Sequence, residues 1–189
     1  MAEQKTKKGV VNGVDTDQLF GTIDAIKDNA AIAKFKFRAR NEWEGGGLNR
    51  TTVDEFYGAC EPRRHEEPFV FAADEPPLLL GGDRGANPVE YLLTALASCV
   101  TTSIVYHAAA RGIELTRLES ELEGDLDLHG FLAISDAVRP GYEKIQMKFR
   151  IEGNASREDL ETLVQEAKHF SPVYDVVSRS VPITVMVVD

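Results

Sequence analysis

The chain has 189 residues, 43% of them hydrophobic and 28% charged, with a formal net charge of −10 at pH 7. This length accommodates one domain with a sizeable core and an extension, and the acidic balance argues against nucleic acid and anionic membranes as partners. Two cysteines are too few for a disulfide scaffold, and the charged N-terminus lacks the apolar core of a signal peptide. We therefore expect a cytoplasmic, reducing location.

The N-terminal part of the sequence predicts an extension followed by strands. Residues 1–13 are expected to be a disordered lead, and Thr16 can cap a helix that ends near Asn29. We therefore place an extension over residues 1–30 and the main domain over residues 31–189.

The main domain is predicted to begin with a hairpin. Residues 33–39 alternate apolar and basic side chains, which indicates a half-buried strand. Residues 43–47 are typical of a hairpin turn, and residues 50–57 of the returning strand. Residues 58–68 are charged and irregular, and residues 68–73 predict another strand.

The most unusual segment is a long helix predicted over residues 87–112. Asn87 is a good N-cap, Pro88 suits the first helical position, and Gly112 suits the left-handed residue after the last turn. Residues 91–110 contain no Asp, Glu, Lys or Arg, so this helix is either buried or membrane-spanning. Thr, Ser and His side chains in its second half favour a buried central helix. The glycine-rich segment before it predicts a flexible approach and lacks the pattern of a phosphate-binding loop.

The C-terminal half predicts strands, two helices and a last strand. Residues 118–128 and 144–152 each alternate, which indicates two antiparallel neighbouring strands, the first with an acidic outer face. A helix is predicted over residues 156–170. It ends there because Ser171 precedes Pro172, and the residue before a proline is disfavoured in the helical region. Ser171 can cap a short helix after it, and residues 181–188 predict a β-branched strand. The class is α+β, with antiparallel strands around a mostly buried helix.

Cys99 lies in the middle of the long helix and has two interpretations. A free cysteine is most often a small buried residue, whereas a reactive thiol needs a nearby cation to lower its pKa. The four histidines lack the spacing of a zinc site, and His107 lies two turns beyond Cys99, too far for a Cys–His pair within one chain. We therefore predict no metal and no cofactor.

Several short motifs follow one another along the chain in a fixed order. They are Asn87-Pro88, Glu90, Leu92-Leu93, Ala95, Ala97-Ser98-Cys99, Gly124-Asp125, a Pro-Gly loop and a final X-Pro-Val. In this order they resemble the OsmC/organic-hydroperoxide-resistance family, and the resemblance extends from about Ala33 to Val188. It implies an OsmC-like fold, in which antiparallel sheets wrap long central helices in an intertwined homodimer. A second copy of the chain would then cover the helix faces that one copy leaves bare.

The resemblance also implies a chemistry. The family's thiol at the position of Cys99 attacks the O–O bond of an organic hydroperoxide and becomes a sulfenic acid, with which a second thiol then condenses. This chain has Ser171 at the position of the second thiol and Val89 at the position of the family's glutamate. A cycle would therefore need an external thiol reductant or Cys60.

The family's arginine, which helps to activate the thiol, has no fixed place in the sequence. Arg38 and Arg40 on the predicted early strand, and Arg84 before the long helix, are the candidates. The sequence therefore predicts an oxidative-stress peroxidase that uses Cys99, with Cys60, Arg38 and Arg40 as further catalytic candidates.

Two other functions remain open. The same fold can be a non-catalytic dimer that binds an apolar small molecule, with Cys99 a spectator, as the serine and valine replacements suggest. A hydrolase or acyltransferase that uses Cys99 with a histidine from another element or subunit is the third alternative.

Overall fold

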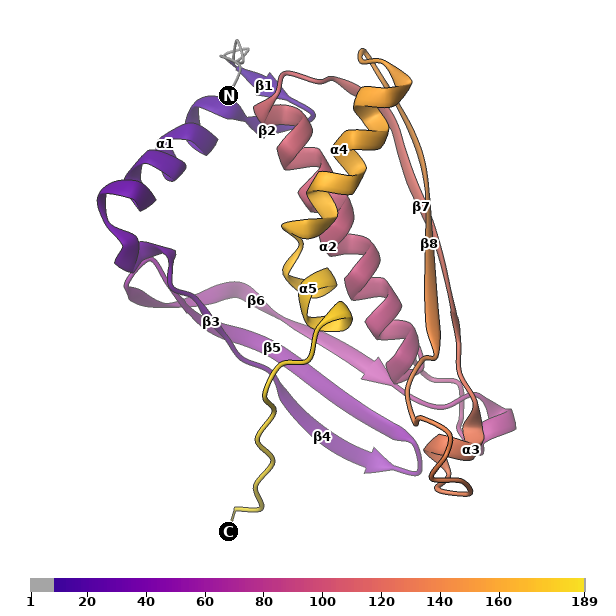
Figure 1. Ribbon diagram of the computed structural model, residues 1–189. Coiled ribbons are helices and arrows are strands. Elements are labelled where there is room, and N and C mark those ends of the chain that lie inside the picture. Colours follow the sequence, from indigo (N-terminus) through magenta and orange to yellow (C-terminus); the bar gives the residue numbers. More distant parts are fainter. Residues whose placement is uncertain (1–8, 189) are drawn as a thin grey trace. The chain divides into compact units, whose positions relative to one another are not determined.

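The computed structural model describes residues 9–188, and their contacts divide the chain into two units. The first unit consists of Met1–Thr16 and Leu93–Asp189, and the second of Asp17–Leu92. The long helix α2, Pro88–Ala110, begins in the second unit and continues through the first (Figure 1).

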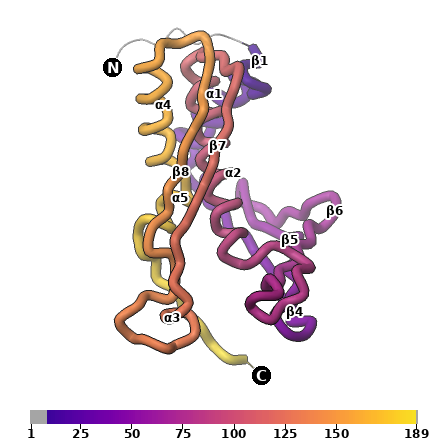
Figure 2. Tube along the Cα trace, turned by 90° about the vertical axis from the view of Figure 1, so that its right-hand side faces the viewer, coloured from indigo at the N-terminus to yellow at the C-terminus, as the bar shows by residue number. Residues whose placement is uncertain are grey.

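The core of the first unit is built on one row of α2. Leu96, Val100, Ile104 and Ala108 follow one another at a spacing of four residues and are all buried, as one face of a helix must be. They pack against the strand β8, Lys144–Gly153, and the helix α4, Arg157–His169, which lie alongside α2 in both views (Figures 1 and 2). Ile104 and Leu163 are fully buried at 0% exposure, so they mark the centre of this core.

The two long strands of the first unit confirm the predicted antiparallel pair. β7, Leu115–Asp125, pairs with β8 along its whole length, with Leu118 opposite Ile151 and Leu122 opposite Met147. These apolar side chains face the core, while the glutamates between them are exposed. A short helix, α3, Leu128–Phe131, begins the connection from β7 to β8.

Two serines begin the C-terminal helices as predicted. The Ser156 hydroxyl accepts a hydrogen bond from the Asp159 amide at 3.1 Å at the start of α4. The Ser171 hydroxyl accepts one from the Tyr174 amide at 3.2 Å at the start of α5, Pro172–Ser178. Such caps satisfy amide groups that have no partner within the helix.

The prediction of a disordered lead is wrong for residues 9–13, while residues 1–8 lie outside the described part of the chain. β1, Val10–Val11, pairs with β2, Val14–Asp15, around a turn in which Asn12 and Gly13 have φ values of 53° and 79°. Asn-Gly is the preferred pair for such a turn. The Asn12 side chain donates to the Ile113 carbonyl at 2.8 Å and accepts from the Leu115 amide at 2.9 Å, which ties the hairpin to the start of β7.

The second unit contains a helix and a sheet. α1, Thr16–Asp28, confirms the predicted N-terminal helix, which starts in the first unit at Thr16. The long strand β5, Leu48–Gly58, is the centre of the sheet. Along one edge it pairs with β3, Lys36–Phe37, and β4, Arg40–Gly45. Along the other edge it pairs with β6, Glu61–Ala73. The β4–β5 connection confirms the predicted hairpin.

This sheet differs from the prediction in three details. Residues 30–33 form a 3-10 turn capped by Asn29, so the strand expected over residues 33–39 is reduced to Lys36–Phe37. Phe37 is not half-buried but 72% exposed, and it stacks on a neighbouring ring at the surface. Residues 61–67 are not irregular, because they form the first half of β6 and pair with β5.

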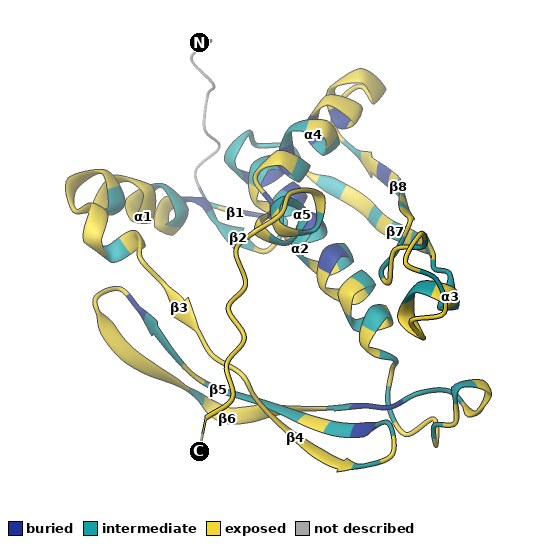
Figure 3. Cartoon of the chain, turned by 60° about the horizontal axis from the view of Figure 1, so that its bottom comes forward, coloured by how far each residue is buried: buried dark blue, intermediate teal, exposed yellow. Residues whose placement is uncertain are grey.

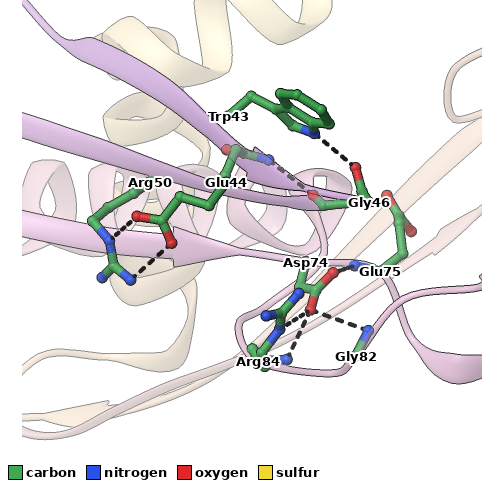
Figure 4. A network of polar contacts seen from close by, with 10 residues as sticks. Trp43, Glu44, Gly46, Arg50, Asp74, Glu75, Gly82 and Arg84 are labelled. Carbon is green, nitrogen blue, oxygen red and sulfur yellow. Dashed lines mark hydrogen bonds and ion pairs between the residues drawn. The ribbon is translucent and has the colours of Figure 1, made fainter.

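The approach to α2 is held in place rather than flexible, because it is organised around Asp74 (Figure 4). This buried carboxylate accepts from the backbone amides of Glu75, Gly82 and Arg84 at 2.9, 3.1 and 3.3 Å, and from the Arg84 Nε at 3.0 Å. Gly85 lies so close to the sheet that an added Cβ would be 2.1 Å from the Ala72 carbonyl oxygen.

The start of α2 confirms the predicted cap. The Asn87 side chain accepts from the Val89 amide at 2.9 Å, and the Glu90 carboxylate accepts from the Asn87 amide at 2.8 Å, as in a capping box. Gly112 follows the last turn with a φ of 69°. α2 is long and apolar enough to cross a bilayer by length and composition alone, but its buried row packs on the chain's own strand and helix.

Residues 180–188 have no regular secondary structure, contrary to the predicted final strand. Their apolar side chains are exposed, including Ile183 at 82% and Val185 at 88% (Figure 3). A strand needs a neighbour with which to exchange backbone hydrogen bonds. In the described part of this single chain, no strand is paired with the segment.

Candidate active site

A shallow pocket of about 510 Å³ lies along α2 in the first unit, on a different face from the buried row. Its lining comes from α2 and from the link between α4 and α5: Ala95, Ser98, Cys99, Thr102, Ser103, Tyr106, His107, Phe170 and Pro172. Helical spacing places Leu92, Leu96, Cys99 and Ser103 on one stripe of α2. The structure divides this stripe, since Leu96 belongs to the core whereas Cys99 and Ser103 line the pocket.

Cys99 is half-buried in the wall of this pocket and carries a free thiol. Its surroundings combine hydrocarbon with hydroxyl groups, of which the Ser98 hydroxyl donates to the Thr94 carbonyl at 2.8 Å. Of the residues that line the pocket in the described chain, none is a lysine or an arginine. The pocket can therefore hold an uncharged, largely apolar molecule beside the sulfur, but it does not itself supply a cation to favour the thiolate.

His107 is the one imidazole in the lining of this pocket. Its ring stacks on that of Phe170, with centroids 5.1 Å apart and planes inclined by 25°. Burial lowers the pKa of His107, and the nearby Arg111 guanidinium lowers it further, while the Glu166 carboxylate acts in the opposite direction. Arg111 and Glu166 form an ion pair. The lowered pKa favours the neutral imidazole, which can exchange hydrogen bonds without adding charge to the site.

Ser171 lies beside the pocket and is fully buried. Its hydroxyl caps α5, and its two neighbours in sequence, Phe170 and Pro172, both line the pocket. His169 is exposed and is not among the lining residues. Ser171, which the resemblance assigns to the position of the second thiol, therefore lies next to the pocket of Cys99 and carries a structural hydroxyl.

The other predicted site residues belong to the second unit. Cys60 is exposed on the turn between β5 and β6, where Ala59 and Cys60 have φ values of 52° and 67°. Arg38 and Arg40 line one common pocket of about 440 Å³. Arg84 is bound to Asp74 and serves the approach to α2. The structure thus brings Arg38 and Arg40 together, and it assigns Cys99 and Cys60 to different units.

Sequence reasoning missed Phe170 as a site residue and did not connect His107 with the pocket. The spacing of Cys99, Ser103 and His107 by four residues places them on one side of α2, and this was the available signal. Phe170 joins them only through the packing of α4 on α2. Over residues 9–188 there is no group of three or more His, Cys, Asp or Glu that could hold a metal ion.

The protein has an α+β fold, and its longest helix lines a pocket that contains Cys99. The sequence profile of the OsmC-like protein family matches residues 81–186, which is more than half of the chain. The chain belongs to this family.

Solved structures agree on the fold. An OsmC-like protein from Mycoplasma pneumoniae is 15% identical, with a TM-score of 0.58 over 77% of this chain and 89% of that one. An OsmC-like protein of unknown function from Vibrio cholerae is 12% identical, with a TM-score of 0.55 over 74% and 92% of the two chains. Identities this low establish the fold alone. No curated protein matches the chain.

Proposed function

We propose that the protein is a thiol-dependent organic hydroperoxide reductase that acts in the cytoplasm with Cys99 as the peroxidatic thiol. The observation that carries the proposal is the placement of this cysteine in a pocket of apolar and hydroxyl groups in a member of the OsmC-like family. The half-buried sulfur is open to a small molecule, and the lining suits the alkyl group and the O–O bond of a hydroperoxide. No metal or cofactor enters the proposed chemistry.

In the first step the Cys99 thiolate attacks one oxygen of the O–O bond. The new S–O bond gives a sulfenic acid, the O–O bond breaks, and the departing alkoxide takes a proton to become an alcohol. Arg38 and Arg40 remain the candidates for the cation that this step needs, as the family resemblance implies.

In the second step a thiol must reduce the sulfenic acid. Ser171 cannot form a disulfide, so the step falls to an external thiol or to Cys60. An external thiol condenses with the sulfenic acid to give a mixed disulfide and water, and a second thiol then releases Cys99 and leaves as a disulfide. With Cys60, the two protein sulfurs form the disulfide, which an external dithiol reduces.

A homodimer is part of this proposal. The helix α2 keeps Leu92 and Tyr106 at 37% and 46% exposure, and residues 181–188 are unpaired and apolar in the described chain. Exposed apolar surface of this kind is typical of an interface. Size-exclusion chromatography with light scattering should give twice the chain mass of 20.8 kDa; a mass of one chain would contradict the dimer.

The experiment for the peroxidase is consumption of an alkyl hydroperoxide with a dithiol as reductant. Wild type should turn over, Cys99→Ser should lose the activity, and Cys60→Ser should distinguish the two routes for the second step. Equal rates for wild type and Cys99→Ser would refute the proposal. The matched control is Ser135→Ala, which removes a hydroxyl from the α3 region, away from the pocket lining.

A second candidate is a non-catalytic dimer that binds an apolar molecule. It is favoured by one observation, that the residues lining the pocket of Cys99 in the described structure include no lysine or arginine. Native mass spectrometry should then show a bound apolar ligand, and trapping with dimedone after hydroperoxide treatment should leave Cys99 unmodified. Rapid sulfenic-acid trapping at Cys99 would decide for the reductase.

A further inference from the structure

The pocket that Arg38 and Arg40 share also contains two arginines and three carboxylates that the proposed thiol chemistry does not use. It lies wholly within the second unit, on the strands β4, β5 and β6, and is an open pocket of about 440 Å³. Four arginines line it, Arg38, Arg40, Arg50 and Arg64, together with three carboxylates. In a chain of net charge −10, four arginines gathered at one place are an unusual feature. We call it the arginine pocket.

Two of the four arginines are already engaged. The Arg50 guanidinium forms two hydrogen bonds to the Glu44 carboxylate, at 2.7 and 3.1 Å (Figure 4). Arg64 pairs with Glu55 at 2.5 Å, and its Nε lies 3.5 Å from an Asp54 oxygen. These pairs fix the walls of the pocket and leave little charge on Arg50 and Arg64 for a ligand.

The other two arginines are available. Among the described residues, no carboxylate lies within ion-pair distance of the Arg38 or Arg40 guanidinium, although both line the same pocket. The pKa of Glu55 is lowered, chiefly by the hydrogen bond from Arg64. The charges of Arg38 and Arg40 contribute to the same lowering. Two planar guanidinium groups at one cavity match the paired oxygens of a carboxylate or a phosphate.

One carboxylate of the pocket also lacks a hydrogen-bond donor. Asp54 Oδ1 is buried and has no hydrogen-bond partner in the described structure, while the other oxygen faces Arg64. A buried acceptor without a donor is costly. Asp54 lines the pocket, so a hydroxyl group of a ligand is the donor that we assign to its carboxylate.

We propose that the arginine pocket binds a small organic oxyanion, a carboxylate or phosphate monoester that also carries a hydroxyl group. Arg38 and Arg40 bind the oxyanion, and Asp54 accepts from the hydroxyl. The volume of about 440 Å³ accommodates a molecule of a few carbon atoms. The inference concerns the second unit alone and does not rest on the reductase.

The test measures binding without thiol chemistry, in the full-length Cys99→Ser protein. Glycerol 3-phosphate, glycerate and inorganic phosphate are titrated in separate calorimetric experiments at low salt. We expect glycerol 3-phosphate or glycerate to bind with a Kd below about 1 mM and more tightly than inorganic phosphate. The tighter of the two organic ligands identifies the oxyanion as phosphate or carboxylate.

The variants assign the binding to the proposed groups. Arg38→Gln and Arg40→Gln should each weaken binding by about tenfold, since each removes a charge-assisted interaction. Asp54→Asn should reduce the preference for the hydroxyl-bearing ligands over inorganic phosphate. Arg157→Gln is the matched control, because its guanidinium pairs with Glu161 on α4 in the first unit.

Two outcomes would overturn the inference. One is no binding of any of the three probes up to about 10 mM, which corresponds to negligible affinity. The other is equal binding by the parent protein and the Arg38→Gln/Arg40→Gln double variant. Circular dichroism identifies a variant that fails to fold, and Arg38→Lys and Arg40→Lys then replace it, because lysine keeps the charge but loses the paired geometry.

Discussion

The rings of His107 and Phe170 stack 5.1 Å apart at the edge of the pocket that contains Cys99. The contact joins α2 to the end of α4, so one titratable group of the candidate site reports on the packing of two helices. Its protonation state is therefore a measurable property of the site.

The first prediction concerns the pH dependence of stability. Burial, and secondly Arg111, lower the pKa of His107 below its usual value of about 6.5. Between the lowered pKa and about 6.5, His107 binds a proton more readily in the unfolded chain than in the folded one. The free energy of unfolding therefore decreases as the pH falls through that range. NMR titration should show the lowered pKa, and Phe170→Leu should raise it. His107→Gln should remove this part of the pH dependence; an unchanged profile would contradict the assignment.

The second prediction concerns the Asp74 carboxylate. Burial alone would raise the pKa of Asp74, but the Arg84 guanidinium and the surrounding amides outweigh it, so the pKa is lowered. Asp74→Asn should therefore lower Tm at pH 7, where the charge stabilises the fold. The difference from wild type should shrink as the pH falls through the lowered pKa, because wild type then loses the charge too. Asp136→Asn, at an exposed position, is the control and should change Tm little.

The third prediction tests the core of the first unit. Leu163 has 0% exposure and packs between α4 and α2. Leu163→Ala should lower the free energy of unfolding by about 3 kcal/mol, since it removes buried methyl groups and leaves a cavity. Leu132→Ala, at a position with 55% exposure, should change it by less than about 0.5 kcal/mol. Similar losses for the two variants in urea unfolding would contradict the assigned core.

The fourth prediction separates the two thiols by access. Cys60 is exposed on a turn, whereas Cys99 is half-buried in the wall of its pocket. A bulky disulfide reagent should therefore modify Cys60 first. Cys60→Ser should remove the fast phase of the reaction and Cys99→Ser the slow phase. A fast phase that survives Cys60→Ser would show that the pocket is more open, or its thiol more reactive, than the structure indicates.

Helix boundaries were the most predictable part of the fold, because their signals are local. The Asn87, Ser156 and Ser171 side chains each satisfy amides within three residues of themselves, so the sequence around each is sufficient. The Asn12–Gly13 turn carried an equally local signal, but the strands beside it have two residues each and were overlooked.

Features that depend on distant segments could not be predicted. The charged residues at the start of β6 become a strand because β5 offers a pairing edge, with Arg64 opposite Glu55.

The prediction of Cys99 as a site residue came from a family resemblance, and its role stays a prediction. The contact of His107 with Phe170 arises from helix packing, which leaves no mark in the spacing of residues 63 positions apart.

The exposed segment over residues 183–188 has a consequence for handling the protein. It is an uncharged hexapeptide, Ile-Thr-Val-Met-Val-Val, of high β-propensity and without proline. Such a stretch adds strands edge to edge between molecules and nucleates insoluble fibrils. Soluble yield should therefore fall as expression is accelerated, and slow synthesis at low temperature should favour recovery of the native protein.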